Sequence, residues 1–485
     1  MKNNKPDSIV RLLNSGSRLI PTNNKLGKLA TSTKLFERKP KKITAPILLS
    51  ALLAALAFSE KSCRAIALSV GVVGDTTISR VAIWRFLGKP TMVVFLERLI
   101  AHVIKEAYKA SDQAILNIGR NSKEVLEGVN RIIIGDATSI CLHPSLHWAF
   151  PGSVNQTDVK KAHLKIQLAV DLLTGKFIDF SLDAYQRSDM KAAFDIIAKL
   201  VKGDLLIRDL GYNKMEVFQQ IIAKEAFFLS RLMLKHNVLD VDGNKIDLVN
   251  KLRQLAPQCG RTIRLKIKMT ESHNVLCDLI AIRVPQEVAN LRRSRLKQKH
   301  ADRGWAKPSD EYLALQDWTI LVTNLPEESA DNEKVRELYM MRWRIEMIFK
   351  ACKSHTGLLK IAQHKTNPNH AKALILGWLL LMAILAQKGA FGMARLREVE
   401  SPETHECYDG LEVHNHSLFK SLTKRVLLVG FQIELASCGM SFDEHWQRTS
   451  HYEQIHNLTD LYPSRLSQSE CLSLVLEVEK IGSLC

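Results

Sequence analysis

The chain has 485 residues, which predicts two to four domains at about 100–200 residues per domain. Hydrophobic residues make up 46% of it, a share that excludes bulk disorder. It carries 68 Lys and Arg against 50 Asp and Glu, so the formal net charge is +18. A surplus of this size indicates a polyanionic partner, with nucleic acid first, but it does not separate an enzyme from a binding protein.

Half of the surplus lies at one end of the sequence. Residues 1–42 hold eleven Lys and Arg and two acids, so 11 − 2 = +9. We interpret residues 1–44 as a basic arm that becomes ordered on a ligand. A solubilising tail is the alternative.

Cysteine usage and apolar runs indicate the compartment. The nine cysteines form no CxxC pair, which is typical of a reducing cytosol and excludes a zinc ribbon. The apolar runs 45–58 and 373–386 each have about 14 residues, fewer than the roughly 20 of a membrane-spanning helix. We therefore expect core helices, no membrane contact and a cytoplasmic, nucleoid-associated protein.

Residues 45–125 are predicted to be helical and to bind DNA. A helical pattern over 62–69 is followed by the glycine-containing segment 71–77 and a second helix over 78–87. This order fits a helix-turn-helix whose second helix presents Arg80 and Arg85 to DNA. Packing in an ordinary helical bundle is the alternative.

From residue 126 the pattern changes to short strands and helices. Residues 164–170 alternate apolar and polar side chains, as a half-buried strand does. The predicted order β-β-β-α-β-α-β is that of an RNase H-like core. Its elements are expected at residues 132–134, 164–170, 177–182, 188–201, 205–207, 213–223 and 227–230.

This core is predicted to have two parts, 126–231 and 316–388, separated by a β-rich insertion at 232–315. The insertion contains a basic run that we expect to contact the DNA backbone, with a solvated loop as the alternative; its arginines are Arg292, Arg293 and Arg295. A strand over 318–322 and a helix over 333–353 resume the core. Residues 389–485 are predicted to be a C-terminal helical region.

Two aspartates share a sequence context. Asp136 and Asp209 each close an apolar strand. Neighbouring strands would bring both carboxylates to one sheet edge, which suits a hard divalent cation. An aspartate at a strand end is also a common turn former.

The helix predicted over 333–353 carries two stripes. The apolar one is followed, about 100° around the axis, by a polar one that would line a cleft. A single acid among aromatic and basic groups is unusual for a solvated face, and it indicates that Glu346 completes a metal site whose neighbours hold phosphates. This polar stripe consists of Tyr339, Arg342, Glu346, Lys350 and Lys353.

The spacing Tyr339-x2-Arg342-x3-Glu346-x6-Lys353 matches the YREK motif. Together with Asp136 and Asp209, it resembles the DDE transposases of bacterial insertion sequences, specifically the IS-four family, over about residues 130–385. The resemblance implies an α/β fold: an RNase H-like catalytic core interrupted by a β-rich insertion, with helical N- and C-terminal domains.

The same resemblance implies roles for these residues. Asp136, Asp209 and Glu346 would be catalytic and bind two Mg²⁺ ions, with Mn²⁺ able to substitute. Tyr339, Arg342 and Lys353 would hold the DNA backbone, and Lys350 is expected to join them. Trp318, 28 residues before Glu346, would stack on a flipped base in members that form a DNA hairpin; a core tryptophan is the alternative. Trp343 is expected to pack.

The expected function is cut-and-paste transposition of an insertion sequence. The enzyme would bind double-stranded DNA at terminal inverted repeats, act as a homodimer through residues 389–485, pass through a hairpin and join ends to target DNA. The alternatives are an RNase H-like nuclease that cleaves without joining, and a transposase-derived DNA-binding regulator without catalysis. The complete carboxylate set argues against the regulator.

Overall fold

The computed structural model describes the middle of the chain, in several ranges. The predicted C-terminal region and the first part of the basic arm lie outside the described residues. Those that it describes are 21–38, 40, 42–58, 61–109, 126–152, 160–234, 238–259, 262–269, 275–355, 357–361 and 367–387.

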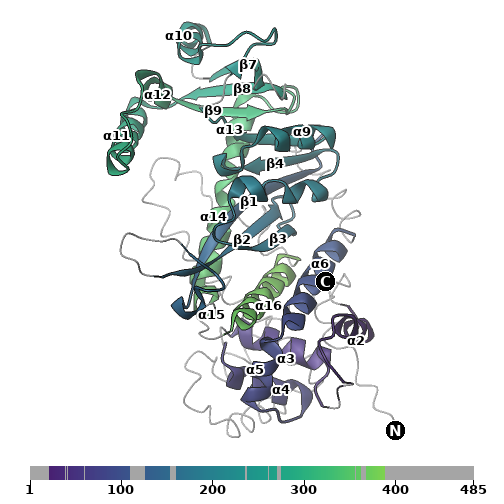
Figure 1. The fold of residues 1–485 in the computed structure, drawn as a ribbon. Helices are drawn as coiled ribbons and strands as arrows, with labels where there is room; N and C mark the ends of the chain where they lie inside the picture. Colours follow the sequence, from purple (N-terminus) through teal and green to yellow (C-terminus); the bar gives the residue numbers. More distant parts are fainter. Residues whose placement is uncertain are drawn as a thin grey trace, which may run out of the picture.

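A nine-stranded sheet runs through the upper and middle parts of the molecule in the order β3-β2-β1-β4-β5-β9-β8-β7-β6 (Figure 1). Strand β4 is parallel to β1 and β5, and the other neighbours are antiparallel. The order of the first five strands is consistent with an RNase H-like core, and the mixed α/β class is confirmed. The strands are β1 (Arg131–Leu142), β2 (Ala162–Asp171), β3 (Phe177–Ala184), β4 (Asp204–Arg208), β5 (Phe227–Arg231), β6 (Val238–Leu239), β7 (Thr262–Met269), β8 (Val275–Arg283) and β9 (Trp318–Thr323).

The central strands are apolar because both faces of the sheet are covered. On β4, Leu205 and Ile207 join the hydrophobic cluster that contains residues of α13 (Asn332–Met341) and α14 (Trp343–His355). Leu206 joins the cluster on the opposite face, which contains residues of α9 (Met215–Ala223). The sheet therefore has an α13/α14 face and an α9 face.

The single helix expected over 188–201 is wrong. The structure has a short α8 (Asp189–Ala192) and a separate 3-10 helix η2 (Asp195–Lys199). In a continuous helix, side chains six residues apart point about 120° away from each other. Instead, Asp189 accepts a hydrogen bond from Lys165 and Asp195 pairs with Arg187. Breaking the helix lets both carboxylates reach these cationic partners.

In its described residues, the segment between β5 and β9 forms strands β6–β8, the 3-10 helix η4 (Leu315–Asp317) and three α-helices that the sequence did not predict. They are α10 (Leu248–Cys259), α11 (Gln286–Asp302) and α12 (Asp310–Ala314). The basic run lies in α11, not in a loop. Strands β6–β8 of this segment continue the core sheet, because β9 pairs with both β5 and β8.

A buried ion pair ties this segment to the helix that follows it. The Arg264 guanidinium pairs with Asp278 at 2.6 Å, and both side chains are less than 10% exposed. Arg264 also donates to the carbonyls of Leu325 and Ala330, in the loop before α13. The start of α13 is thereby fixed to the extended sheet.

A helical layer lies below the sheet (Figure 1). Helix α16 (Pro368–Gln387) packs against α3 (Ala45–Ala57) and α6 (Pro90–Lys109), so distant segments share one core. The α16 window Pro368–Ala386 is long and apolar enough to cross a membrane, but 89% of it is buried inside the fold. Within the described part of the N-terminal region, α2 (Asn23–Ser32) packs against α3.

The two helices expected as a helix-turn-helix are α4 (Cys63–Gly74) and α5 (Arg80–Leu87). The turn begins later than expected, because Gly71 and Gly74 belong to α4 and the left-handed residue is Asp75, with φ +50°. Arg80 and Arg85 are exposed on α5.

Replacing Ser79 with Ala should weaken α5 by about 1 kcal/mol, because the Ser79 hydroxyl accepts a hydrogen bond from the amide of Ala82. If α5 contacts DNA, duplex affinity falls with it in a fluorescence anisotropy titration. Ser188→Ala, which removes the matching cap of α8, is the control. An equal loss of affinity in both variants would contradict a DNA contact by α5.

Candidate active site

The two aspartates lie side by side because of the strand register. Gly135 of β1 pairs with Arg208 of β4 in the last parallel pair, so Asp136 and Asp209 are the next residues on adjacent strands. Asp209 does follow the end of β4. Asp136 does not close its strand as predicted, because β1 continues to Leu142, paired with β2. The carboxylates meet where β4 ends and β1 continues.

Both carboxylates point to the α13/α14 face of the sheet. On β1, Ile132 and Ile134 belong to the cluster on that face, whereas Ile133 belongs to the opposite one. The two-residue period of a strand therefore places Asp136 on the α13/α14 face.

The single helix expected over 333–353 is interrupted at Arg342, which separates α13 from α14. The amide of Arg342 bonds to the carbonyl of Tyr339, and that of Ile345 to Arg342, so 3-10 hydrogen bonds tighten the chain here. No Gly or Pro occurs between residues 332 and 355 to signal the interruption. The predicted apolar stripe is largely confirmed: Leu338, Ile345, Ile348 and Cys352 are buried, and Met341 is half-buried.

Arg342 connects the helix to the sheet. Its Nη1 lies 2.8 Å from Glu346 Oε1 and 3.6 Å from Asp136 Oδ2. Among the residues that the structure describes, no three His, Cys, Asp or Glu side chains are placed to hold a metal ion as they stand. One guanidinium thus pairs with two of the three carboxylates of the site.

The pKa of Asp136 shows how crowded the site is. Burial raises this pKa to about 6, and the carboxylates of Asp209 and Glu346 raise it as well. The amide of Ala137, 2.7 Å from Oδ1, and the Arg342 guanidinium oppose this rise. Three carboxylates that repel one another favour an added cation.

The other residues of the polar stripe form two groups, one next to the carboxylates and one farther along α14. Burial, and then the charge of Asp209, raise the pKa of Tyr339 to about 12, so its hydroxyl stays protonated. Lys350 is exposed on α14. Burial lowers the pKa of Lys353, whereas nearby Cys141 of β1 raises it, which places this lysine beyond the carboxylates along β1. Tyr339 and Arg342 therefore adjoin the acidic site, and Lys350 and Lys353 extend it.

Trp318 lies where the alternative of a core tryptophan puts it, and Trp343 does not lie as expected. Trp318 does begin a strand, β9, but its side chain is only 8% exposed in the core of the α9 face. This burial argues against the predicted stacking role. Trp343, expected to pack, is 42% exposed.

Two of the three arginines of α11 hold the protein together. Arg292 donates to the carbonyl of Trp318 and the hydroxyl of Thr319. Arg293 pairs with Asp317. Arg295 is exposed.

One charged residue near the site was not predicted from the sequence. Arg208 lies beneath Gly135 on the α9 face, with its guanidinium 4.3 Å from the ring centre of Tyr212. Its Nη1 donates weakly to the carbonyl of Ala193 at 3.4 Å.

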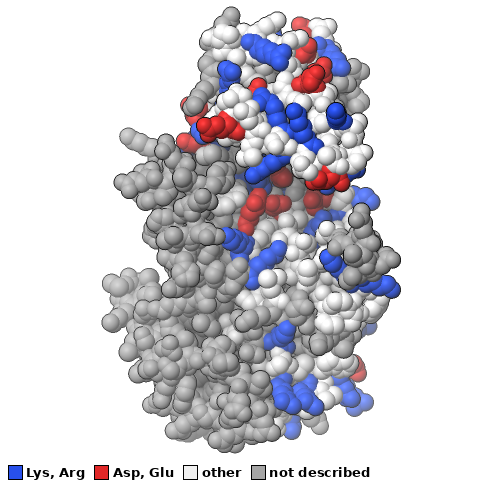
Figure 2. Space-filling view, turned by 90° about the vertical axis from the view of Figure 1, so that its left-hand side faces the viewer, with Lys and Arg blue, Asp and Glu red and all other residues white. Residues whose placement is uncertain are grey.

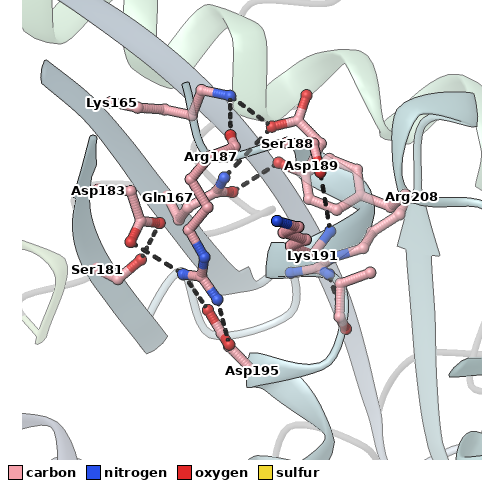
Figure 3. A network of polar contacts seen from close by, with 12 residues as sticks. Lys165, Gln167, Ser181, Asp183, Arg187, Ser188, Asp189, Lys191, Asp195 and Arg208 are labelled. Atoms are coloured by element: carbon pink, nitrogen blue, oxygen red, sulfur yellow. Dashed lines mark hydrogen bonds and ion pairs between the residues drawn. The ribbon is translucent and has the colours of Figure 1, made fainter. Parts of the chain in front are cut away.

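Arg208 lies at the edge of a polar network that crosses β2 and β3 (Figure 3). The hydroxyl of Tyr212 donates to Gln167 at 2.6 Å, and the amide of Gln167 reaches Asp189. This network supports β1 and β4 from behind the carboxylates.

Replacing Gly135 with Ala should destabilise the protein by about 1–3 kcal/mol, as overpacking does. A Cβ atom at this position would lie 2.9 Å from Nε of Arg208, which is enclosed by Tyr212 and Ala193. Chemical denaturation measures the effect. Gly27→Ala, where no atom lies within 4 Å of the added Cβ, should not lower stability. An equally stable Gly135→Ala protein would show that Arg208 moves freely.

The strand order and the facing acidic side chains are consistent with an RNase H-like core. Residues 127–384 match the family described as Transposase DDE domain, which is more than half of the chain. The chain belongs to this family, and the resemblance to an insertion-sequence DDE transposase is confirmed.

Its similarity to curated proteins is moderate. It is 29% identical over 281 residues to the transposase for insertion sequence element IS231F of Bacillus thuringiensis subsp. israelensis, covering 54% of this chain and 56% of the relative. The IS-four placement fits the IS231 relatives. It is 27% identical over 229 residues to the putative transposase InsL for IS186A of Escherichia coli (strain K12), covering 45% and 59%. The chain thus matches about half the length of these relatives.

A solved structure that aligns over more of the chain is the cryo-EM structure of the piggyBac transposase synaptic complex with hairpin DNA. It covers 95% of this chain and 87% of that chain, with 9% identity and a TM-score of 0.35. A TM-score this low does not establish a common fold.

Proposed function

We propose that this protein is an insertion-sequence transposase that cleaves DNA at terminal inverted repeats and joins the released ends to target DNA. The observation that carries the proposal is the position of Asp136 on β1 beside Asp209, the residue directly after β4, with Glu346 linked to Asp136 through the Arg342 ion pairs. The family and the names of the relatives support it.

The three carboxylates fit a pair of Mg²⁺ ions, or Mn²⁺, by the chemistry of their oxygen donors. Burial, and to a smaller extent the charges of Asp209 and Glu346, raise the pKa of Asp136, and a bound cation would offset both effects. When bound, the ions supply an activated water or 3′-hydroxyl and stabilise the leaving oxygen. In this structure Arg342 supplies the positive charge next to Asp136 and Glu346. The guanidinium must therefore leave these carboxylates when metal ions bind to them.

Arg342 is then available to a DNA phosphate, for which a guanidinium is suited. Tyr339 keeps its proton and donates a hydrogen bond beside it. Lys350 and Lys353 extend the positive edge along α14. These four side chains orient the scissile phosphodiester over the carboxylates.

Binding of the rest of the DNA falls to basic surfaces outside the site. We assign it to the arm at residues 1–44, to Arg80 and Arg85 of α5, and to α11, where Arg292 and Arg293 fix the helix that presents Arg295. Figure 2 shows Lys and Arg side chains gathered on the upper part of the face on the α11 side, with acidic side chains in a recess beneath them. A homodimer that pairs two ends, a hairpin route and a cytoplasmic, nucleoid-associated location complete the proposal.

A strand-transfer assay tests it, with labelled DNA carrying the repeats that flank the gene, and Mg²⁺. We expect nicked, hairpin and joined products on a denaturing gel. Cleavage without joined product would replace the proposal with an RNase H-like nuclease. Binding without cleavage would replace it with a DNA-binding regulator.

A further inference from the structure

We infer that Trp305, at the C-terminal end of α11, stacks on an unpaired base of the DNA that this protein binds. The inference rests on the proposed function. It adds a contact for an unpaired nucleotide in the segment between β5 and β9, at a residue that no motif marks.

The ring of Trp305 is exposed and fixed. Its side chain is 51% exposed. Its amide bonds to the carbonyl of His300, and that of Gly304, with φ +62°, to Ala301, which together form a Schellman motif. The indole also lies 5.4 Å from the His300 ring, at 88°. The rigid turn holds a large aromatic surface in solvent at little entropic cost to a ligand.

The chain around this ring is strongly basic. Residues 288–307 contain seven Lys and Arg and one acid, so 7 − 1 = +6. Arg295 and Lys299 are exposed four residues apart, and Arg303 follows four residues later, so they share one side of the helix end. A row of cations therefore leads along α11 to the tryptophan.

The arginine nearest the ring joins the two features. The Arg303 guanidinium lies 4.8 Å from the centre of the Trp305 ring. A cation over the ring is attractive to a DNA phosphate, and an indole is attractive to any base because every base has a π-face. One residue pair thus offers a backbone contact and a base contact together.

The base must be unpaired, because bases inside a duplex already stack on their neighbours. Trp318, the residue predicted for this task, is buried, and its carbonyl accepts a hydrogen bond from Arg292. The same arginine therefore anchors the helix that carries Trp305. Buried Trp318 helps to support the helix, while exposed Trp305 contacts the ligand.

The alternative is a purely structural role, in which the indole only closes the turn against His300. Binding to two probes separates the roles. We would titrate the full-length protein, without divalent metal, into fluorescein-labelled oligothymidylate and into a duplex of the same length. Anisotropy reports binding of each, and quenching of tryptophan fluorescence reports stacking.

For Trp305→Ala, we expect affinity for oligothymidylate to fall by about 5- to 150-fold, the range that one stacked base supplies, and duplex affinity to change by less than about twofold. Trp305→Phe should restore most of the loss, since a smaller ring still stacks. Tyr312→Ala, at an exposed aromatic of α12 beside Asp310 and Glu311, should leave both affinities unchanged.

Equal losses on both probes, no loss on either, or a lowered thermal midpoint that accounts for the change would overturn the inference. If the wild-type protein joins DNA ends but the Trp305→Ala variant still binds oligothymidylate with wild-type affinity, the stacking inference is wrong and the proposed function stands. Wild-type protein that binds neither probe would refute the proposed function as well.

Discussion

Replacing Glu346 with Gln should lower DNA cleavage by about a thousandfold or more and leave binding to transposon-end DNA nearly unchanged. The substitution keeps the size of the side chain but removes the charge that completes the carboxylate set. A metal ion contributes several kcal/mol of charge stabilisation to the transition state, and each 1.36 kcal/mol is a factor of ten in rate. Cleavage of labelled end DNA under single-turnover conditions measures the loss.

The stability of this variant should not change. The Glu346 side chain is 43% exposed, so its ion pair with Arg342 contributes little to folding. Glu333→Gln is the matched control, because it removes an ion pair of the same kind, with Arg336, from the surface of α13. It should cleave at the wild-type rate. A Glu346→Gln protein that still cuts would refute the site assignment.

The acidic site could be predicted because its signals are local. Apolar runs predict the strands beside which Asp136 and Asp209 lie, and spacings of three and four place Tyr339, Arg342 and Glu346 along one side of the predicted helix. The interruption at Arg342 left no trace in the sequence. It falls at the residue whose guanidinium contacts both a sheet carboxylate and a helix carboxylate, and those contacts exist only after the elements have packed.

Helix α11 could not be recognised by periodicity. Among its 17 residues only Ala289 is buried, so no apolar stripe marks the helix. Its Leu, Arg, Lys and Gln side chains are good helix formers, but they leave no periodic signal. Arg292 and Arg293, near the middle of the helix, attach it to residues 317–319. Arg208 could not be recognised either, for the opposite reason: it is a charged residue that the fold encloses. An arginine at a strand end is expected in solvent, yet the face of Tyr212 shelters it.

The sequence left two roles open for Trp318. Its burial in the structure leads to the second prediction of a large effect. Trp318→Ala should lower the free energy of unfolding by about 3–5 kcal/mol, the cost of emptying a buried aromatic site. Urea denaturation measures it. Trp305→Ala, at an exposed site, should stay within about 0.5 kcal/mol of the wild type.

The kinetics of the same variant distinguish a core residue from a base-flipping one. Loss of core packing reduces the fraction of folded protein, so the first nick and the second-strand step should slow by the same factor. That factor should match the folded fraction measured by denaturation. A base-flipping tryptophan would instead slow the second-strand step selectively in a protein of normal stability. Because Trp318 begins β9, which joins β5 to β8, and its carbonyl accepts from Arg292 of α11, we expect the first result. Selective slowing without destabilisation would mean that the ring leaves the core when DNA binds.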